Sequence, residues 1–328
     1  MREARLSTGA SEERGTNGEP LAECLVVGAG PAGLTAALYL ARYRRRVTVL
    51  HDGSARALRI PRTHNAPGFP EGVSGPDLID RMQRHGRRYG AEFRESRIVD
   101  AWRESETFVI ESESGDRWRG RTLILATGLQ LNQLPLEHDA HEAAIAAGVL
   151  RYCPICDAAE YVGKRIGIVG CTPSGGNEAL FLRRYSDRVT LVPWGQLELS
   201  DHERAALTER RIDVSAESAT RFDLSGRDIT VEFVSGAYAE FDVVFPALGV
   251  RPRTELAQAL GLPVTEDGSV DAQAPFATEI PGLYSVGDVV DGLDQISVAV
   301  GHGAIAATKA HSWLREQDGE CLPPRAGR

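Results

Sequence analysis

The chain has 328 residues, enough for about two domains of ordinary size. Apolar residues make up 42% of it and charged residues 25%, as in an ordinary soluble globular protein. The formal net charge of −9 argues against a nucleic-acid-binding protein, which needs a basic surface, and disfavours an anionic membrane surface. No apolar run approaches the length of a membrane span. We therefore expect neither nucleic acid nor a membrane among the partners.

Residues 1–20 are polar and charged, without the apolar core of a secretory signal, and we expect them to form a disordered tail. The five cysteines, at positions 24, 153, 156, 171 and 321, are too few and too scattered for a secreted disulfide framework. A cytoplasmic location is the expectation that fits them best.

The first pattern is a strand, a glycine turn, a helix and a strand. Leu21–Val27 is apolar and ends in glycines, an apolar stretch then runs to Arg46, and Val47–Leu50 is apolar again. This order predicts a βαβ unit. Two of the three loop glycines have separate tasks: Gly28 permits the tight turn, and Gly33 permits close packing of helix on strand.

In the same loop Gly30 lets the backbone approach a pyrophosphate, and Pro31 and Ala32 complete the motif. The acidic residue that would bind a ribose is expected about 20 residues further on. Asp52 stands one place late for that role, and a solvated turn residue is an equally good interpretation of it.

The next segments read as a Gly/Pro-rich stretch (61–76), a helix over Pro76–Tyr89 and short strands within 91–110. Leu123–Gly128 and Val243–Gly249 are apolar strands that end in small residues, and we interpret them as crossing points between domains.

Cys153-Pro154-Ile155-Cys156 is followed at once by Asp157. A C-x-x-C beside a βαβ pattern in a cysteine-poor protein predicts a dithiol that cycles with a disulfide. A helix that begins there lowers a thiol pKa, and Asp157 can move protons to and from the thiolate. Zinc bound by the pair with His138 and His141 is the rival interpretation, although a surface position is simpler for that His-x-x-His. An inert structural pair is the third.

A second nucleotide fold follows the cysteines: Arg165–Val169 predicts a strand, Asn177–Arg184 a helix and Arg188–Val192 another strand. Its glycine loop, Gly170–Gly175, has Thr172 at the middle position, where a side chain obstructs the approach to a pyrophosphate.

After the second strand of this fold no arginine occurs until Arg204, although a 2′-phosphate needs one. The fold is expected to be kept, with weak affinity for NADPH. Trp194 either stacks on an adenine or is a packed aromatic residue.

Near the C-terminus Gly282–Asp288 predicts a strand and a tight turn, and a long helix is expected from near Gln295 to about Glu316. The predicted fold class is α/β, with two Rossmann-like three-layer nucleotide-binding domains, the second inserted in the first. The expected bounds are a tail (1–20), a first domain (21–130 and 250–316), a second domain that carries the C-x-x-C (131–249) and a tail (317–328).

Six motifs occur in the order found in low-molecular-weight thioredoxin reductases, and the resemblance covers roughly residues 21 to 316. They are Gly28–Gly33, Asn65–Phe69, Ala126–Gly128, Cys153–Asp157, Gly287-Asp288 and Gln295-Ile296. The resemblance implies an FAD domain split around a smaller domain of pyridine-nucleotide type, in a homodimer.

The same resemblance implies roles for single residues. Asn65 and Thr127 line the flavin cleft, the backbone at Ile98 meets the adenine, and Asp288 holds the ribityl chain. Cys156 faces the flavin, Cys153 attacks the partner disulfide and Asp157 is the acid–base group. The full set assigned to the cofactor is Gly28, Gly30, Pro31, Ala32, Gly33, Asp52, Asn65, Ile98, Ala126, Thr127, Gly128, Gly287, Asp288, Gln295 and Ile296.

The chain departs from the family's NADPH-using members, which have a complete second glycine loop and an arginine-rich motif after it. The resulting hypothesis is an FAD-dependent dithiol–disulfide oxidoreductase whose electron partner is a second flavin or other dinucleotide, a redox protein or oxygen. The substrate is expected to be a thioredoxin-like protein or a small-molecule disulfide or dithiol. A conventional NADPH-dependent thioredoxin reductase is the main alternative, and a flavin-binding module with relic cysteines is another.

Overall fold

The computed structural model describes residues 21–224, 228–271 and 276–322. The tail expected over residues 1–20 and the last part of the tail expected over 317–328 lie outside these residues. The chain divides into two compact units. Of the described residues, the first is built from 21–55, Ile79–Gly128 and those from Pro252 to Leu322, and the second from Arg56–Leu78 and those within Leu129–Arg251.

The sheet of the first unit has the strand order β3-β2-β1-β6-β5-β4, and β16 also pairs with β6. Strands β1, β2, β3, β6 and β16 pair with one another in parallel, whereas β5 pairs antiparallel with both β6 and β4. The elements are β1 (Ala22–Val27), α1 (Pro31–Arg42), β2 (Val47–His51), α2 (Gly75–Arg88), β3 (Glu92–Glu95), β4 (Ile98–Glu104), β5 (Thr107–Ser112), β6 (Arg117–Leu125), α7 (Glu255–Ala259), β16 (Leu283–Ser285) and α8 (Ile296–Gln317).

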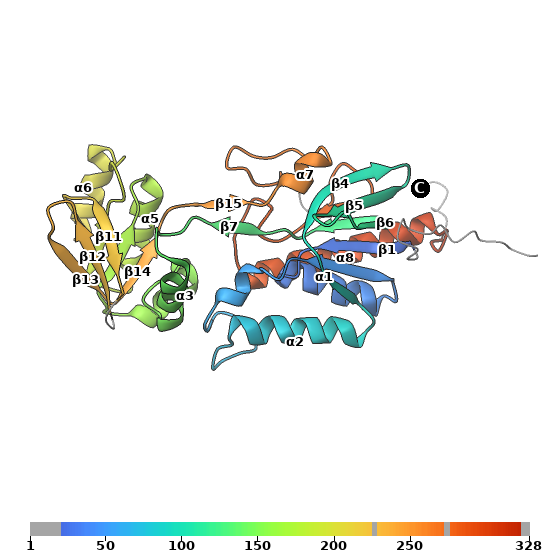
Figure 1. Ribbon diagram of the computed structural model, residues 1–328, viewed down its shortest axis with the longest axis horizontal. Helices are drawn as coiled ribbons and strands as arrows, with labels where there is room; N and C mark the ends of the chain where they lie inside the picture. The colour runs from blue at the N-terminus through green and yellow to red at the C-terminus, as the bar shows by residue number, and fades with distance from the viewer. Residues whose placement is uncertain (1–20, 225–227, 272–275, 323–328) are drawn as a thin grey trace, which may run out of the picture. The chain divides into compact units, whose positions relative to one another are not determined.

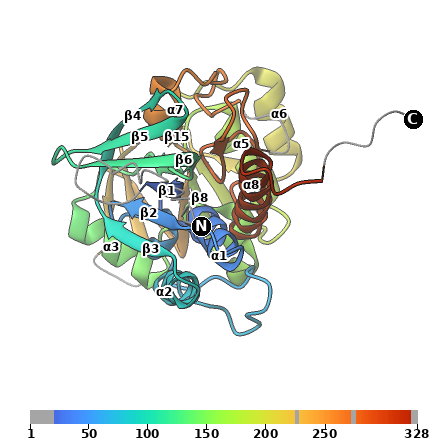
Figure 2. The ribbon, with the colours of Figure 1, turned by 90° about the vertical axis from the view of Figure 1, so that its right-hand side faces the viewer.

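Helices α1 and α8 pack together against one face of the parallel strands, and on the other face these strands share a second core with side chains of β4, β5 and α7 (Figures 1 and 2). The apolar side chains of β1 alternate between the two cores, with Cys24 and Val26 in one and Leu25 and Val27 in the other. This alternation is what a strand buried on both faces requires.

The second unit repeats the layered plan around a four-stranded parallel sheet of order β10-β9-β8-β14. An antiparallel sheet, β11-β12-β13, and α3 share one apolar core with it, and α5 and α6 share the other. The elements are α3 (His138–Ala147), α4 (Pro154–Asp157), β8 (Ile166–Val169), α5 (Pro173–Leu182), β9 (Val189–Val192), α6 (Asp201–Glu209), β10 (Asp213–Val214), β11 (Ala219–Asp223), β12 (Ile229–Phe233), β13 (Tyr238–Phe241) and β14 (Val243–Pro246). The predicted fold class is confirmed.

Strands β7 (Leu129–Leu131) and β15 (Val250–Pro252) form a two-stranded ribbon where the chain passes between the units. The ribbon is fastened at its ends, because the backbone amide of Asn132 donates to the carbonyl of Gly249 (3.2 Å) and that of Arg253 donates to Gly128 (2.9 Å). The two predicted crossing segments lead directly into these strands.

One helix end differs from the prediction. The apolar stretch that reaches Arg46 suggested a longer helix, but α1 ends at Arg42 and the chain then turns through Arg44, which has a φ of 64°. The Arg45 side chain does not cap the helix; its Nη1 pairs with Glu23 (2.7 Å) and Asp318 (2.8 Å). Among the described residues, none of the helices has the length and apolar character needed to span a membrane.

Candidate functional site

The first glycine loop connects β1 to α1, and its three glycines meet different surroundings. A Cβ on Gly28 (φ 109°) would lie 2.2 Å from the carbonyl oxygen of Ala126, and a Cβ on Gly33 would lie 2.0 Å from that of Gly28. A Cβ on Gly30 would meet no atom within 4 Å. Gly28 and Gly33 therefore serve protein packing, whereas Gly30 leaves open backbone at the N-terminus of α1, where an anionic phosphate is stabilised.

Two of the other predicted cofactor segments, Ala126–Gly128 and Gly287-Asp288, follow the carboxyl ends of neighbouring strands. The amide of Ala126 donates to Val27 (2.8 Å), and that of Val286 donates to Leu125 (2.9 Å), so β1, β6 and β16 end side by side. The Thr127 hydroxyl donates to the carbonyl of Arg253 (2.7 Å). Ligands of open parallel sheets bind at this edge.

The turn after β16 lies against α1. Gly287 (φ 77°) would bring a Cβ within 2.9 Å of the Ala32 side chain, and its amide donates to Nδ1 of His302 on α8 (3.3 Å). Burial lowers the pKa of His302, which keeps that nitrogen free to accept. His302 was missed by sequence reasoning; its position between Gly301 and Gly303 was the only local signal.

Gln295 is the N-cap of α8 and Ile296 its first residue, as the sequence predicts. Asp52 is held in its turn because its carboxylate accepts the Ser54 amide (3.0 Å) and hydroxyl (2.6 Å), which helps lower its pKa although burial opposes the shift. Ile98 begins β4 and packs on the core that contains Val27. Asn65 belongs to the second unit, together with the cysteines.

Cys153 and Cys156 form a disulfide with their Cα atoms 5.2 Å apart. Cys153 is the N-cap of α4 and Pro154 is the first helical residue, which suits the fixed φ of proline. The Cys156 amide donates to the Cys153 Sγ (3.1 Å), and the amides of Cys156 and Asp157 both lie 3.1 Å from the Cys153 carbonyl oxygen. Backbone N–H groups at this helix start stabilise a thiolate at Cys153.

Asp157 follows the disulfide and is half-buried. Burial raises its pKa to about 6, and the nearby charge of Glu160 acts in the same direction, while Arg151 and His64 act against it. The Glu160 carboxylate lies 2.8 Å from Nδ1 of His64. A carboxyl group that titrates near neutral pH can both give and take a proton, which is what exchange between a thiol and a disulfide requires.

The two histidines of the His-x-x-His motif separate. His138 is exposed, but His141 is 1% exposed, so the surface position expected for the motif is wrong for His141. Its Nε2 lies 2.6 Å from the Tyr152 hydroxyl and its Nδ1 lies 2.8 Å from the Arg59 guanidinium, which also binds Glu142. Within residues 21–224, 228–271 and 276–322, no group of three potential ligands is arranged to hold a metal ion.

The second glycine loop repeats only part of the first. Gly170 is packed against Ala247, where a Cβ would lie 2.8 Å from the carbonyl oxygen, but Thr172 stands at the N-cap of α5, the place of Gly30 in the first loop. The amide of Glu198 donates to the carbonyl of Cys171 (2.7 Å), so the segment after β9 is attached to this loop.

Arg204 and Trp194, the residues that the sequence suggested for contact with a nucleotide, bind or pack against other parts of the protein. The Arg204 guanidinium donates to the carbonyls of Leu199 (3.2 Å) and Leu197 (3.4 Å). Trp194 packs on the apolar core, with its ring 5.3 Å from that of Phe222, as its packed-residue interpretation expects. The residues of this loop therefore do not fit a dinucleotide as those of the first loop do.

The fold and the two sites define a nucleotide-binding disulfide oxidoreductase. The sequence profile of the pyridine nucleotide-disulphide oxidoreductases matches residues 22–303. The chain belongs to this family, and within it the chain is similar to the thioredoxin reductases and is a flavin-dependent disulfide oxidoreductase.

Two groups of relatives support this assignment. The thioredoxin reductase of Listeria innocua is 28% identical over 313 residues, with 91% of this chain and 95% of that protein covered. Among solved structures, HlmI has a TM-score of 0.84 at 30% identity, covering 92% of this chain and 94% of that one. The thioredoxin reductase of Streptococcus pyogenes has a TM-score of 0.82 at 26% identity, covering 90% and 99%. Membership of the family implies FAD, and the open backbone at Gly30 fits its pyrophosphate.

Proposed function

We propose that this protein exchanges an electron pair between FAD and the Cys153–Cys156 disulfide, and that its electron partner is not NADPH. One observation carries the first half of the proposal: a disulfide at the start of a helix is followed directly by an aspartate whose pKa is raised to about 6. Bound FAD supplies or accepts the electrons. The cofactor would be held by the fifteen residues that the motifs and the resemblance together assign to it.

The protein's own residues manage the sulfur chemistry. Reduction of the disulfide by two electrons and one proton leaves one thiol and one thiolate. The thiolate of Cys153 then attacks a sulfur of the substrate disulfide, the substrate S–S bond breaks and a mixed disulfide forms. Asp157 takes the proton of the Cys156 thiol, the Cys156 thiolate attacks the Cys153 sulfur and the internal disulfide returns, and Asp157 passes the proton to the leaving substrate thiolate. The oxidase direction reverses these steps.

The second half of the proposal is supported by Thr172, by the hydrogen bond from Glu198 to Cys171 and by the engaged Arg204. Because the same features disfavour any dinucleotide in the second loop, we do not propose a second flavin there. The electron partner is then another redox protein or, in the oxidase direction, oxygen. Because relatives carry the name thioredoxin reductase, a thioredoxin-like protein is the first substrate to test, followed by small disulfides and dithiols. We also propose that the protein is a homodimer.

The test is anaerobic stopped-flow reduction of the purified flavoprotein with saturating NADPH, NADH or a small dithiol. We expect rapid bleaching of the flavin by the dithiol and none on that timescale by either nucleotide. Cys153→Ser should abolish bleaching by the dithiol, and Cys171→Ser, a change at a cysteine outside the pair, should leave it intact. A dithiol that fails to reduce the flavin of the unchanged protein contradicts the first half of the proposal.

A conventional NADPH-dependent thioredoxin reductase is the second candidate, because this chain matches proteins named thioredoxin reductase over nearly their whole length. Rapid bleaching of the flavin by NADPH would establish it. In that case the hydrogen bond between Glu198 and Cys171 must break when NADPH binds. Because the Thr172 side chain obstructs the pyrophosphate, Thr172→Gly should then strengthen NADPH binding. Under our proposal, Thr172→Gly alone should not produce rapid reduction, because the 2′-phosphate still has no arginine partner.

A further inference from the structure

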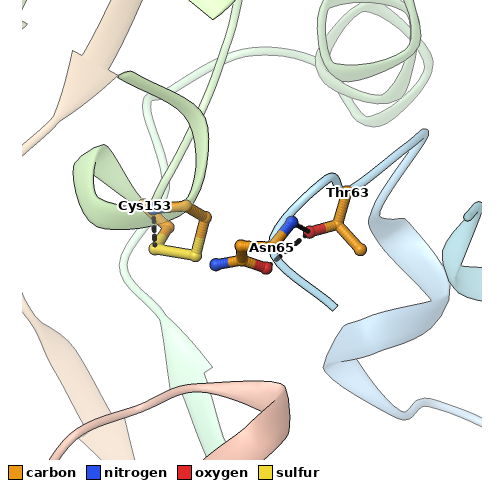
Figure 3. Close-up of a disulfide and its surroundings, with 4 residues drawn as sticks. Thr63, Asn65 and Cys153 are labelled. Atoms are coloured by element: carbon orange, nitrogen blue, oxygen red, sulfur yellow. Dashed lines mark hydrogen bonds between the residues drawn. A yellow bond between two sulfur atoms is a disulfide. The ribbon is translucent and has the colours of Figure 1, made fainter. Parts of the chain in front are cut away.

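The disulfide has a polar neighbour that is distant in the sequence. Asn65 belongs to the segment Arg56–Leu78, which forms part of the same compact unit as the cysteines. Figure 3 shows the Asn65 side chain directed toward the disulfide, with its amide nitrogen at the end that faces the sulfur atoms. The family resemblance assigns Asn65 to the cofactor alone.

The orientation of this amide is fixed by Thr63. The Thr63 hydroxyl donates to the Asn65 Oδ1 (2.7 Å), so the oxygen is turned toward Thr63 and the NH2 group toward the sulfurs. Thr63 is only 3% exposed, and its backbone amide and carbonyl both pair with Val73, at 2.9 and 3.0 Å. A side chain with its oxygen held in this way presents donors, not an acceptor, to the disulfide.

The two sulfur atoms differ in their backbone support. The Cys153 Sγ accepts the Cys156 amide. In Figure 3 the dashed line of this bond reaches one sulfur, and the amide nitrogen of Asn65 points to the side of the other, which is that of Cys156. A second donor placed there favours the charged form of Cys156 once the disulfide is reduced, because a hydrogen bond to an anion lowers the pKa of its acid.

We propose that the Asn65 amide donates a hydrogen bond to the Cys156 thiolate of the reduced protein and that Thr63 is the positioning residue that aims it. The inference rests on the proposed dithiol function. It divides the stabilisation of the two thiolates between a helix start, for Cys153, and a side chain, for Cys156.

The test measures the pKa of the Cys156 thiol in the flavin-loaded protein, from the pH dependence of alkylation by iodoacetamide. A Cys153→Ser background leaves Cys156 as the only thiol of the pair and keeps a side-chain oxygen at the N-cap. We expect Asn65→Ala to reduce the alkylation rate about three- to tenfold at about pH 7, because a lost hydrogen bond to a charged group raises the thiol pKa. Asn65→Asp should reduce it further, since it places a negative charge beside the sulfur.

Matched changes separate this role from loss of structure. Thr63→Val removes the hydroxyl at nearly constant volume and should shift the pH profile of alkylation in the same direction as Asn65→Ala. Thr63→Ser keeps the hydroxyl and should keep the parent profile. Gln133→Ala, which removes an exposed amide, should leave it unchanged. If Asn65→Ala and Asn65→Asp titrate like the parent at equal flavin content, the inference is wrong. Alkylation needs no electron transfer. The experiment therefore tests the role of Asn65 even if the cysteine pair proves unable to reduce or oxidise FAD.

Discussion

His302 of α8 and Gly287 are 15 positions apart in the sequence, yet the amide of Gly287 donates to Nδ1 of His302 across 3.3 Å. The imidazole also packs against Phe276, with ring centroids 3.8 Å apart and ring planes tilted by 32°. The bond needs an unprotonated Nδ1, and burial lowers the pKa of His302 accordingly, although the charge of Asp288 opposes the shift. The turn that leads to Asp288 is thus fixed by a hydrogen-bond acceptor, the His302 Nδ1, which is lost when acid protonates the imidazole.

This relationship predicts acid-sensitive stability. The unfolded chain takes up a proton on His302 near its ordinary pKa of about 6.5, while the folded chain takes it up only at lower pH, so the free energy of unfolding should fall as the pH drops below about 6.5. His302→Gln keeps an acceptor that does not titrate and should reduce this slope by up to about one proton. Urea unfolding at several pH values measures it.

His202→Gln, at an exposed histidine of α6, serves as the control and should keep the parent slope. An unchanged slope in His302→Gln would show that His302 titrates alike in the folded and unfolded chains, contrary to the prediction.

Much of the fold could be predicted because its signals are local. The apolar run before Gly28 and the glycine spacing after it define β1 and the start of α1, and the same argument applies to β8 and Pro173 in the second unit. The C-x-x-C pair with its aspartate also lies within five consecutive residues. Patterns of this length are decided by strand burial and turn geometry, which the sequence displays directly.

The parts that sequence reasoning missed depend on contacts between distant residues. Arg59 reaches His141 and Glu142, and His64 reaches Glu160, so the segment Arg56–Leu78 is fastened to the second unit by pairs more than 80 positions apart. No periodicity encodes such pairs. For the same reason the burial of His141 and the direction of the Asn65 amide could not be foreseen.

The glycines of the first loop predict two opposite phenotypes. In Gly30→Ala the new methyl group meets no protein atom, so stability should change by less than about 1 kcal/mol, while the methyl occupies the space of the pyrophosphate and FAD is lost. In Gly33→Ala the methyl meets the Gly28 carbonyl, and overpacking should cost about 1–3 kcal/mol or more. Flavin absorbance per chain and thermal unfolding of the apoprotein check both. Full FAD content in Gly30→Ala would show that the cofactor does not approach this backbone.

Glu178 on α5 predicts a stabilising substitution. Burial raises the pKa of this carboxyl to about 7, and its Oε2 has no hydrogen-bond partner among the described residues. The folded-state pKa is raised, so the benefit of the protonated form is lost as the pH rises from about 4 through about 7. Glu178→Gln should therefore stabilise the protein by roughly 1–3 kcal/mol at about pH 8 and by little at about pH 4. Equal effects of the substitution at both pH values would contradict the burial argument.

Asp157 predicts that stability and activity respond in opposite directions to one substitution. Its pKa is raised to about 6, so the ionised carboxylate present at about pH 8 is a cost to the folded state, and Asp157→Asn should add roughly 1–3 kcal/mol to the free energy of unfolding there. The same change removes the proton donor and acceptor beside the dithiol. Exchange with a substrate disulfide should slow by about a hundredfold or more, and the pH step near 6 in its rate should disappear.

Rapid-mixing kinetics with a thioredoxin-like protein and urea unfolding of the same preparations measure the two effects of Asp157→Asn. Asp139→Asn, at an exposed carboxyl of α3, should change neither quantity appreciably. A purely structural aspartate would lower stability and activity together when replaced, and an unimportant one would leave the exchange rate intact. Only a buried acid–base group gives a protein that is harder to unfold and slower to react, because the carboxyl that chemistry needs is the one that burial penalises.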